Sequence, residues 1–93
     1  MESRLGAVPE SMRKQIKAAR TSRKWSQAEL GRRVGLPQTH ISGIESGRVA
    51  PRVDTLIDVV RVLDLDLLLV PRALVPAVQA ILRGEGEESL YGA

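Results

Sequence analysis

The clearest chemical signal in this 93-residue chain lies in residues 38–46. If this segment forms a helix, Ile41 and Ile44 fall on one stripe, three positions apart, and point inward. The opposite face then presents hydrogen-bonding side chains and one glycine, namely Gln38, Thr39, His40, Ser42 and Gly43. A short helix face of this kind, held by a rigid neighbouring helix, fits the major groove of DNA, where base edges offer donors and acceptors. The segment therefore predicts a helix that reads DNA.

The preceding residues predict the neighbouring helix and a tight turn. Ser26 and Glu29 form the capping-box pattern S-x-x-E, in which the Ser26 hydroxyl accepts from the Glu29 N–H and the Glu29 side chain reciprocates. Gly35 suits the end of this helix because glycine adopts the left-handed conformation at little cost. Pro37 suits the start of the next helix. The inward apolar positions of the first helix are Ala28, Leu30 and Val34.

Two further helices are expected around this pair. Residues 9–22 form one, with Pro9 in its first turn and residues 1–8 before it as a polar tail. Its apolar face holds Met12, Ile16 and Ala19. Residues 53–63 form the other, whose apolar stripe covers the core. That stripe holds Val53, Leu56, Ile57, Val60 and Leu63. Trp25 is interpreted as a core or cap residue rather than a base-stacking one.

The charge is divided unequally along the chain. Residues 1–52 hold eleven basic and four acidic residues, a net charge of +7, whereas residues 53–93 carry −4. Arg13, Lys17, Arg20 and Lys24 form a basic stripe on the first helix, which by itself is equally well explained as a solvated surface. The basic half coincides with the two central helices, as phosphate neutralisation requires. The acidic half is expected to face away from DNA.

Residues 12–69 resemble the helix-turn-helix domain of Cro/cI-type (XRE) repressors. The resemblance is carried by SQAEL at 26–30, Gly35 at the turn, ISGIESG at 41–47 and the run 51–63 as a fourth helix. It implies an all-α, lambda-repressor-like domain of four to five helices over residues 9–65, with the motif itself at about 26–46. It also implies an internal salt bridge between Arg20 and Glu45.

The same resemblance implies the DNA contacts. Gln38 matches the leading base-reading position, where an amide bonds adenine N6 and N7. Thr39 is expected to contact thymine or a base edge. His40 is expected to contact a phosphate or a base, unless it is a solvated residue at the rim. Ser42 is expected to contact a base or the DNA backbone. The phosphate contacts are expected to be Arg23, Lys24, Gln27, Ser46, Arg48 and Arg52, with Gln27 also bracing Gln38.

This chain departs from the family pattern at two positions. Gly43 stands where a long base-reading side chain is common, so it either permits close approach of the backbone to DNA or reduces the direct contacts. Pro37 replaces the usual side-chain cap of the third helix. Readout of DNA shape is therefore expected to carry more of the sequence preference.

The residues after the domain predict one short strand and one more helix. The stretch from residue 64 first alternates between acidic and apolar residues and then stays apolar until Pro71, which predicts a short strand at about 66–70. A solitary strand leaves its backbone unpaired, so we expect it to pair with the same strand of a second copy; the alternatives are an extension of the fourth helix or an extended segment on the core. The apolar residues of this dimer strand are Leu65, Leu67, Leu68, Leu69 and Val70. A short helix is expected at 75–83, completing a dimerisation region at 66–83, and residues 84–93 are an acidic tail expected to be flexible.

This Leu-rich strand ending in Pro71 and Arg72, together with the short extension, resembles the HipB-type antitoxins. The resemblance implies a homodimer that binds double-stranded operator DNA with an inverted repeat, represses its own operon and holds a HipA-type serine/threonine kinase toxin. The alternative is a solitary XRE-family repressor without a toxin. The basic half disfavours an adaptor that binds no DNA.

Composition excludes several other classes. The chain has no cysteine, one histidine and scattered carboxylates, so no metal site, cofactor site or catalytic constellation is expected, and the protein is not predicted to be an enzyme. No signal-peptide pattern is present, and the longest apolar run is far too short to cross a membrane. A bacterial, cytoplasmic, nucleoid-associated location is expected.

Overall fold

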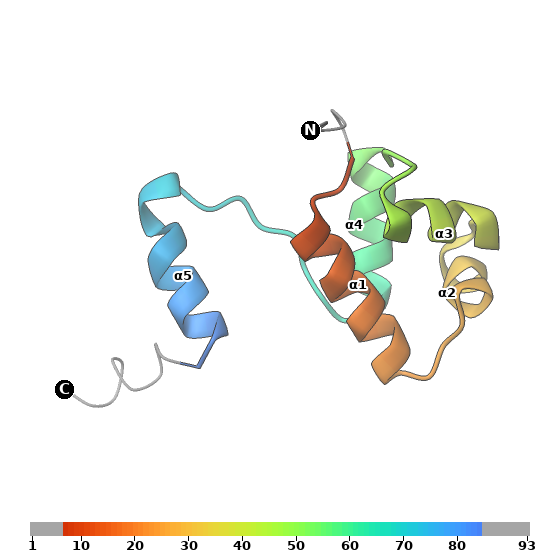
Figure 1. The fold of residues 1–93 in the computed structure, drawn as a ribbon, viewed down its shortest axis with the longest axis horizontal. Coiled ribbons are helices and arrows are strands. Elements are labelled where there is room, and N and C mark those ends of the chain that lie inside the picture. The colour runs from red at the N-terminus through yellow and green to blue at the C-terminus, as the bar shows by residue number, and fades with distance from the viewer. Residues whose placement is uncertain (1–6, 85–93) are drawn as a thin grey trace.

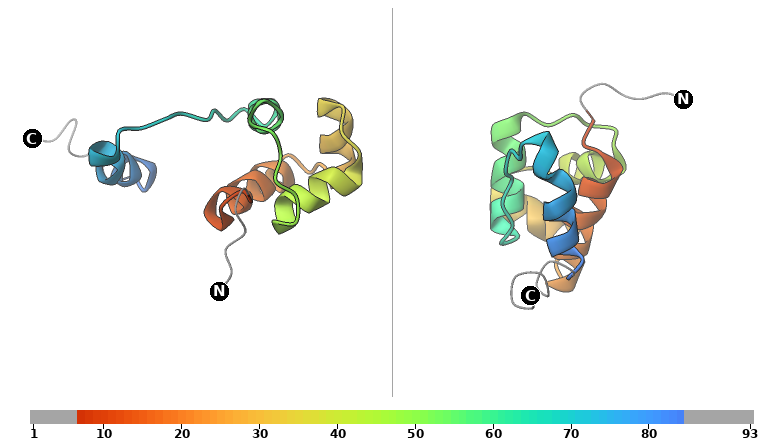
Figure 2. Two further views of the ribbon diagram at one scale, coloured as in Figure 1. Left: turned by 90° about the horizontal axis from the view of Figure 1, so that it is seen from above. Right: turned by 90° about the vertical axis from the view of Figure 1, so that its left-hand side faces the viewer.

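The computed structural model describes residues 7–84, which form five α-helices and one 3-10 helix. The elements are α1 Glu10–Ser22, α2 Gln27–Val34, α3 Gln38–Ser46, α4 Val53–Val62, η1 Arg72–Leu74 and α5 Val75–Leu82. Helices α1 to α4 form one packed body, with α2 and α3 on the side opposite to α5 (Figure 1). Helix α5 stands apart at the end of an extended segment, as the left view of Figure 2 also shows. The helical part of the predicted fold is confirmed.

The core lies where α1, α2, α3 and α4 meet. Its central cluster consists of Ile16, Leu30, Ile41, Val59, Val60 and Leu63. Burying each of these side chains contributes about 1.5–3 kcal/mol relative to exposure. Val59 and Val8 are buried although neither was expected to be, and Val53 is 68% exposed although it was placed on the inner stripe. The inner face of α4 is thus rotated by part of a turn from the predicted one, and the domain includes the last residue of the expected tail.

The junction of α2 and α3 follows the predicted local signals. The Ser26 hydroxyl accepts from the Glu29 N–H at 3.0 Å, while the Glu29 carboxylate pairs with Arg32 and Arg33 instead of closing the capping box. Gly35 ends α2 in the left-handed conformation at φ 75°, and Pro37 precedes α3 without a side-chain cap bond.

One inward position of α2 was predicted wrongly. Ala28 is exposed, and Gly31 is the residue that α2 buries beside Leu30. The Leu36 N–H donates to the Gly31 carbonyl at 2.8 Å, so the chain turns back tightly over Gly31. A Cβ on Gly31 would overlap with the Leu36 carbonyl oxygen. The close approach of α2 to the turn therefore requires a residue without a side chain.

The segment between α4 and α5 contains no hydrogen-bonded strand, and residues 7–84 as a whole contain none. Residues 65–71 run extended instead (Figure 1). A β-strand is defined by hydrogen bonds to a neighbouring strand, and the folded part of this single chain offers these residues no partner strand. The short 3-10 helix η1 that precedes α5 was not expected, whereas α5 itself, with Pro76 in its first turn, was predicted. Within the described part of the chain, no helix has the length and apolar character that a membrane crossing requires. The predicted acidic tail, except for Gly84, lies outside the described residues.

Replacing Gly31 with Ala tests the packing of α2 on the turn. Alanine at an open helical position stabilises by about 1 kcal/mol relative to glycine. Here the overlap with the Leu36 carbonyl is expected to reverse the sign and to lower the free energy of unfolding by about 1–3 kcal/mol. Urea denaturation measures the change. Ala28→Gly on the exposed side of the same helix is the control, with an expected loss of about 1 kcal/mol from propensity alone. A Gly31→Ala variant more stable than the wild type would contradict this packing.

Candidate nucleic-acid interface

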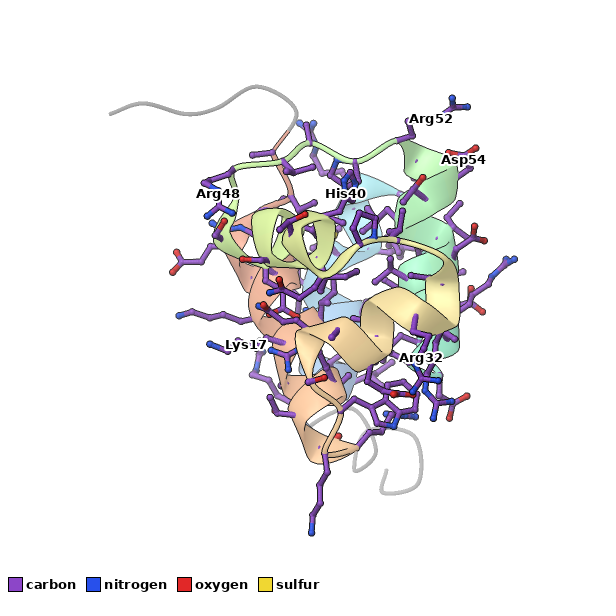
Figure 3. The ribbon with its side chains drawn as sticks, turned by 90° about the vertical axis from the view of Figure 1, so that its right-hand side faces the viewer. Lys17, Arg32, His40, Arg48, Arg52 and Asp54 are labelled. Atoms are coloured by element: carbon purple, nitrogen blue, oxygen red, sulfur yellow. The ribbon has the colours of Figure 1, made fainter. Side chains whose placement is uncertain are left out.

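Helix α3 presents a polar face outward because its two isoleucines point inward. Ile41 and Ile44 are each 1% exposed. Gln38 and Thr39 at the start of α3 are exposed, and His40 and Ser42 are half-buried at its rim. Figure 3 looks onto α2 and α3, with Arg48, His40 and Arg52 along one edge of this surface. Four of the five predicted base-contacting residues therefore reach the surface of one helix.

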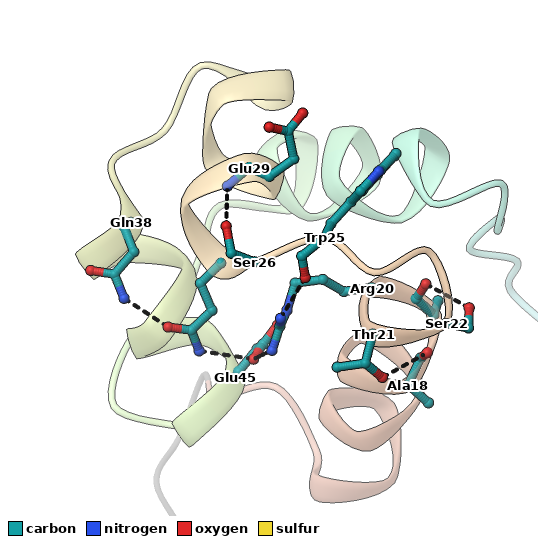
Figure 4. Close-up of polar contacts among 11 residues, drawn as sticks. Ala18, Arg20, Thr21, Ser22, Trp25, Ser26, Glu29, Gln38 and Glu45 are labelled. Carbon is teal, nitrogen blue, oxygen red and sulfur yellow. Dashed lines mark hydrogen bonds and ion pairs between the residues drawn. The ribbon is translucent and has the colours of Figure 1, made fainter.

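A buried ion pair connects α1 to α3. The Arg20 Nε donates to Glu45 Oε2 at 2.7 Å, and Arg20 Nη2 donates to Glu45 Oε1 at 2.9 Å. The two side chains are only 8% and 5% exposed. Arg20 Nη1 also donates to the Trp25 carbonyl at 2.9 Å, which ties the ion pair to the start of α2 (Figure 4). This is the pair expected from the sequence.

Two amides extend this ion pair to the exposed end of α3. Gln27 Nε2 donates to Glu45 Oε1 at 3.0 Å, and Gln38 Nε2 donates to Gln27 Oε1 at 2.7 Å (Figure 4). Because a carboxylate only accepts, Gln27 must turn its nitrogen to Glu45 and its oxygen to Gln38. Gln38 in turn gives one N–H to Gln27 and keeps its oxygen and second N–H for the exterior. The chain of bonds thus sets the amide orientation of Gln38.

The ionisation of Glu45 follows from its partners. Burial by itself raises the pKa of the Glu45 carboxyl, but the hydrogen bonds from Arg20 and Gln27 and the charges of Arg20 and Lys17 outweigh it. The pKa therefore lies below its ordinary value, and Glu45 is charged at neutral pH.

Two residues of the predicted basic stripe serve the fold. Arg20 is buried in the ion pair. Arg13 turns toward the end of α3, where its Nε donates to the Val8 carbonyl at 2.8 Å and its Nη1 to the Glu45 carbonyl at 3.3 Å. A guanidinium there also opposes the negative end of the α3 dipole. Neither charge is directed at an external phosphate.

The predicted phosphate contacts lie in different settings. Lys24 and Arg48 are exposed, whereas the Arg52 guanidinium is paired with the Asp54 carboxylate at 3.2 Å. Arg23 is half-buried, lying 5.7 Å from the Trp25 ring centre. The Ser46 hydroxyl is exposed and donates to the Gly43 carbonyl at 3.2 Å. These groups therefore differ in how accessible they are to an external anion, and Lys24 and Arg48 are the most accessible.

Lys17 was missing from the predicted contact residues. It lines a shallow depression of about 160 Å³ together with Gln27, Ser42, Glu45 and Ser46. This depression adjoins the start of α2, and Lys17 and Arg48 project on the same side of the surface in Figure 3. The available signal was the spacing of three residues between Lys17 and Arg20, which places both on one face of α1.

Gly43 does not lie on the outer face of α3. It is buried, and a Cβ there would overlap with Cγ2 of Val49 in the loop that leads to α4. The expectation that Gly43 contacts bases is therefore corrected: the glycine lets the loop pack against α3. Helical spacing alone misplaced it because α3 is covered by this loop as well as by its neighbouring helices.

Among the described residues 7–84, the side chains form no candidate site for a metal ion. No group of three or more histidine or acidic side chains in that part of the chain is arranged to hold a metal ion. The arrangement offers donors, acceptors and positive charge on a protruding helix pair, which is the chemistry of recognition by contact.

Comparison with known proteins agrees with this geometry. Residues 16–70, more than half of the chain, match the helix-turn-helix family. The chain is an XRE-type helix-turn-helix protein. It is 48% identical over 73 residues to an uncharacterized HTH-type transcriptional regulator, y4dL, of Sinorhizobium fredii (strain NBRC 101917 / NGR234). That match covers 78% of this chain but only 37% of the relative, so the chain spans well under half of the relative's length.

Within the helix-turn-helix motif, some elements hold α3 in place and others face outward. In this helix-turn-helix protein α2 and the turn at Gly35 hold α3, and the ion pair of Arg20 and Glu45 locks α1 against both. Hydrogen bonds through Gln27 connect this ion pair to Gln38, which is exposed at the start of α3. The motif therefore combines a packed apolar side with a polar side whose first residue is held by hydrogen bonds.

The depressed pKa of Glu45 predicts a loss of stability in acid. A carboxyl whose pKa is lower in the folded state stabilises the fold above its unfolded pKa, about 4.3, and loses this contribution as pH falls through the folded value. Glu45→Gln is expected to be less stable than the wild type at neutral pH, by up to about 3–5 kcal/mol, because Arg20 loses its counter-charge. Its stability should also change less with pH in the acid range. Urea denaturation in a series of acidic buffers tests both, and equal acid dependence of the two proteins would contradict this origin.

Proposed function

We propose that this protein is a sequence-specific transcriptional repressor that reads double-stranded operator DNA with α3. The observation that carries the proposal is the Gln38 side chain, held at the exposed start of α3 by Gln27 and the buried ion pair. A preorganised side chain loses little conformational freedom on binding, so its hydrogen bonds discriminate between bases more strongly. The location that follows is the cytoplasm and nucleoid of a bacterial cell, and the role involves no catalysis.

The orientation of Gln38 favours adenine. Its outward oxygen accepts from adenine N6 and its remaining N–H donates to N7, which together form the bidentate pairing of an amide with this base. Thr39 and Ser42 supply neighbouring contacts, with the Thr39 methyl suited to thymine. His40 at the rim is assigned to a phosphate or an adjacent base.

Phosphate binding is assigned to the charges that remain outside the fold. Lys17, Gln27 and Ser46 line the polar depression, and Arg48 projects on the same side of the surface as Lys17 (Figure 3). Lys24, Arg23 and Arg52 complete the set, the last after release from Asp54. Each neutralised phosphate releases counterions, so affinity is expected to fall steeply with salt.

A homodimer is part of the same proposal. Two apolar residues of the segment 65–70 are strongly exposed in the single chain, Leu68 at 76% and Leu69 at 100%, whereas Leu67 packs against the core. Pairing of this segment with its copy across a two-fold axis would form the expected strand ladder. Two recognition helices then address half-sites about 34–36 Å apart, so the operator is expected to be an inverted repeat.

Gln38→Ala and Arg48→Ala separate base reading from phosphate binding. Gln38→Ala is expected to cost about 1–3 kcal/mol on the preferred operator and to relax the preference at one base pair. Arg48→Ala should weaken all DNA alike and reduce the slope of log affinity against log salt by about one per lost phosphate contact in each chain.

Fluorescence anisotropy on the operator and on single-base variants measures both effects. Thr55→Ala, a polar substitution on α4, is the control and should change neither. Unchanged discrimination after Gln38→Ala would refute the assignment of α3 as the reading helix, and a salt slope that Arg48→Ala leaves intact would remove Arg48 from the phosphate set.

We also propose that the repressor is the antitoxin of a HipA-type serine/threonine kinase toxin and autoregulates the operon of both. Support comes from the resemblance of residues 65–72 to the HipB-type strand and from the acidic residues 85–93, which play no part in binding phosphate. The alternative remains a solitary XRE-family repressor whose C-terminal region serves dimerisation alone.

Removal of residues 84–93 tests the kinase partner. We expect this variant to keep operator affinity and to lose affinity for the kinase encoded beside it, because the acidic tail is the proposed docking segment. Replacing Glu85, Glu87 and Glu88 with Gln is the finer variant, with a smaller loss in the same direction. Calorimetry with the purified kinase measures both. Unchanged kinase affinity in both variants would exclude the tail, and the absence of any kinase gene or co-purifying partner would favour the solitary repressor.

A further inference from the structure

The C-terminal arm, defined here as residues 68–84, exposes apolar surface that its own domain does not cover. Helix α5 has no buried residue. Leu74, Ile81 and Leu82 are 54%, 53% and 77% exposed. An isolated helix shorter than about 12–15 residues is marginal in water, so α5 requires a packing surface in order to persist. Because η1 is too short to provide one, that surface must come from elsewhere.

A matching hollow lies on the packed body between α1 and α4. It has a volume of about 120 Å³, enough for one leucine or isoleucine side chain. Its lining is mostly apolar, with Asp66 as its acidic member, and consists of Met12, Gln15, Ile16, Val60, Leu65, Asp66 and Leu67. Because the hollow opens at the root of the arm, the arm and its docking surface are adjacent parts of one chain.

The chain's own α5 is carried away from this hollow. Residues 65–71 run extended and place α5 at a distance from α1 and α4 (Figures 1 and 2). Pro71 at the start of η1 and Pro76 in the first turn of α5 restrict the backbone at both ends of the bend. An arm that leaves its own domain in this way is suited to reach a neighbouring molecule.

We infer that α5 of each chain docks into the α1–α4 hollow of a second copy, in a reciprocal exchange of arms. The charges support a second copy as the occupant: the arm carries Arg72 and Arg83 and no acidic residue, whereas the lining of the hollow includes Asp66. The arm therefore has a net charge of +2, and the hollow contributes a carboxylate. Opposite charges of this kind fix orientation and disfavour other partners.

The exchange is compatible with DNA binding. A two-fold axis makes each contact occur twice, so each of the two hollows receives one arm and each arm is buried. Helix α3 lies on the side of the body opposite to the arm (Figure 1). Docking of the arms is therefore expected to leave the recognition face of each chain open. The inference rests on the proposed dimeric repressor and specifies what holds its two chains together.

Disulfide trapping tests the exchange, and the absence of native cysteine gives a clean background. The double variant Gln15→Cys/Ile81→Cys places one thiol at the rim of the hollow and one on α5. Oxidation of the full-length protein is expected to give a covalent dimer on a non-reducing gel. Each single variant, and the pair Ser22→Cys/Ile81→Cys with a thiol at the far end of α1, are controls that should remain mostly monomeric.

The other outcomes overturn the exchange. A disulfide within one chain would show that α5 folds back on its own hollow. Cross-linking of Ile81→Cys alone at the rate of the double variant would show that α5 pairs with α5. No cross-link in the double variant would leave the hollow unoccupied by α5, including the case in which the arm binds another protein.

A second measurement separates this inference from the proposed function. Ile81→Asp/Leu82→Asp is expected to shift the protein toward monomer in sedimentation, with Val53→Asp, an exposed apolar residue far from the arm, as the control that stays dimeric. Dimers that persist in the first variant contradict the exchange. Base discrimination by Gln38 is measured independently of the cross-link. If the cross-link forms but Gln38→Ala does not change base discrimination, the proposed repressor function is wrong and the exchange of arms is still supported.

Discussion

The buried ion pair between Arg20 and Glu45 is the interaction on which the rest of the structure depends. It joins α1 to α3, and a third bond from Arg20 to the Trp25 carbonyl adds the start of α2. Burying two charges costs nearly as much as their attraction returns, so such a pair contributes geometry more than stability. Here the geometry is put to use at the surface, because the same carboxylate holds Gln27 and thereby Gln38. The orientation of the exposed Gln38 side chain is thus set by a buried ion pair.

The positive charge of the domain serves two purposes that composition does not distinguish. Arg13 and Arg20 satisfy carbonyls and a carboxylate inside the fold, and Arg33 stacks on the Trp25 ring at 4.0 Å. These guanidiniums shape the motif without facing a ligand. Lys17, Lys24 and Arg48 remain exposed around the depression and the α3 loop. The electrostatic field around the domain is the sum of all charges, whereas the phosphate contacts that we propose involve the smaller exposed set.

The C-terminal arm carries apolar surface that a single chain leaves uncovered. Leu69 is fully exposed, and α5 has no buried residue, while the body offers an apolar hollow at the arm's root. In the assembly that we infer, each chain supplies one arm and one hollow, and both apolar surfaces are buried. The two-fold symmetry that such an assembly creates is also what recognition of an inverted repeat requires.

Local signals in the sequence determined the helices and their ends. Ser26, Gly35 and Pro37 act through hydrogen bonds and backbone angles within a few residues, so α2, α3 and the turn between them followed directly. The pairing of Arg20 with Glu45 was also within reach, through resemblance to a known motif. Tertiary structure alone decided what depends on packing between distant segments: the burial of Val8 and Gly43, the exposure of Ala28, and the place of Lys17 beside Gln27. Helical periodicity predicts one apolar face, but it does not tell which side a covering loop or a neighbouring helix occupies. The strand expected at residues 66–70 between two chains stays a prediction for the related reason that a strand exists only where another backbone completes it.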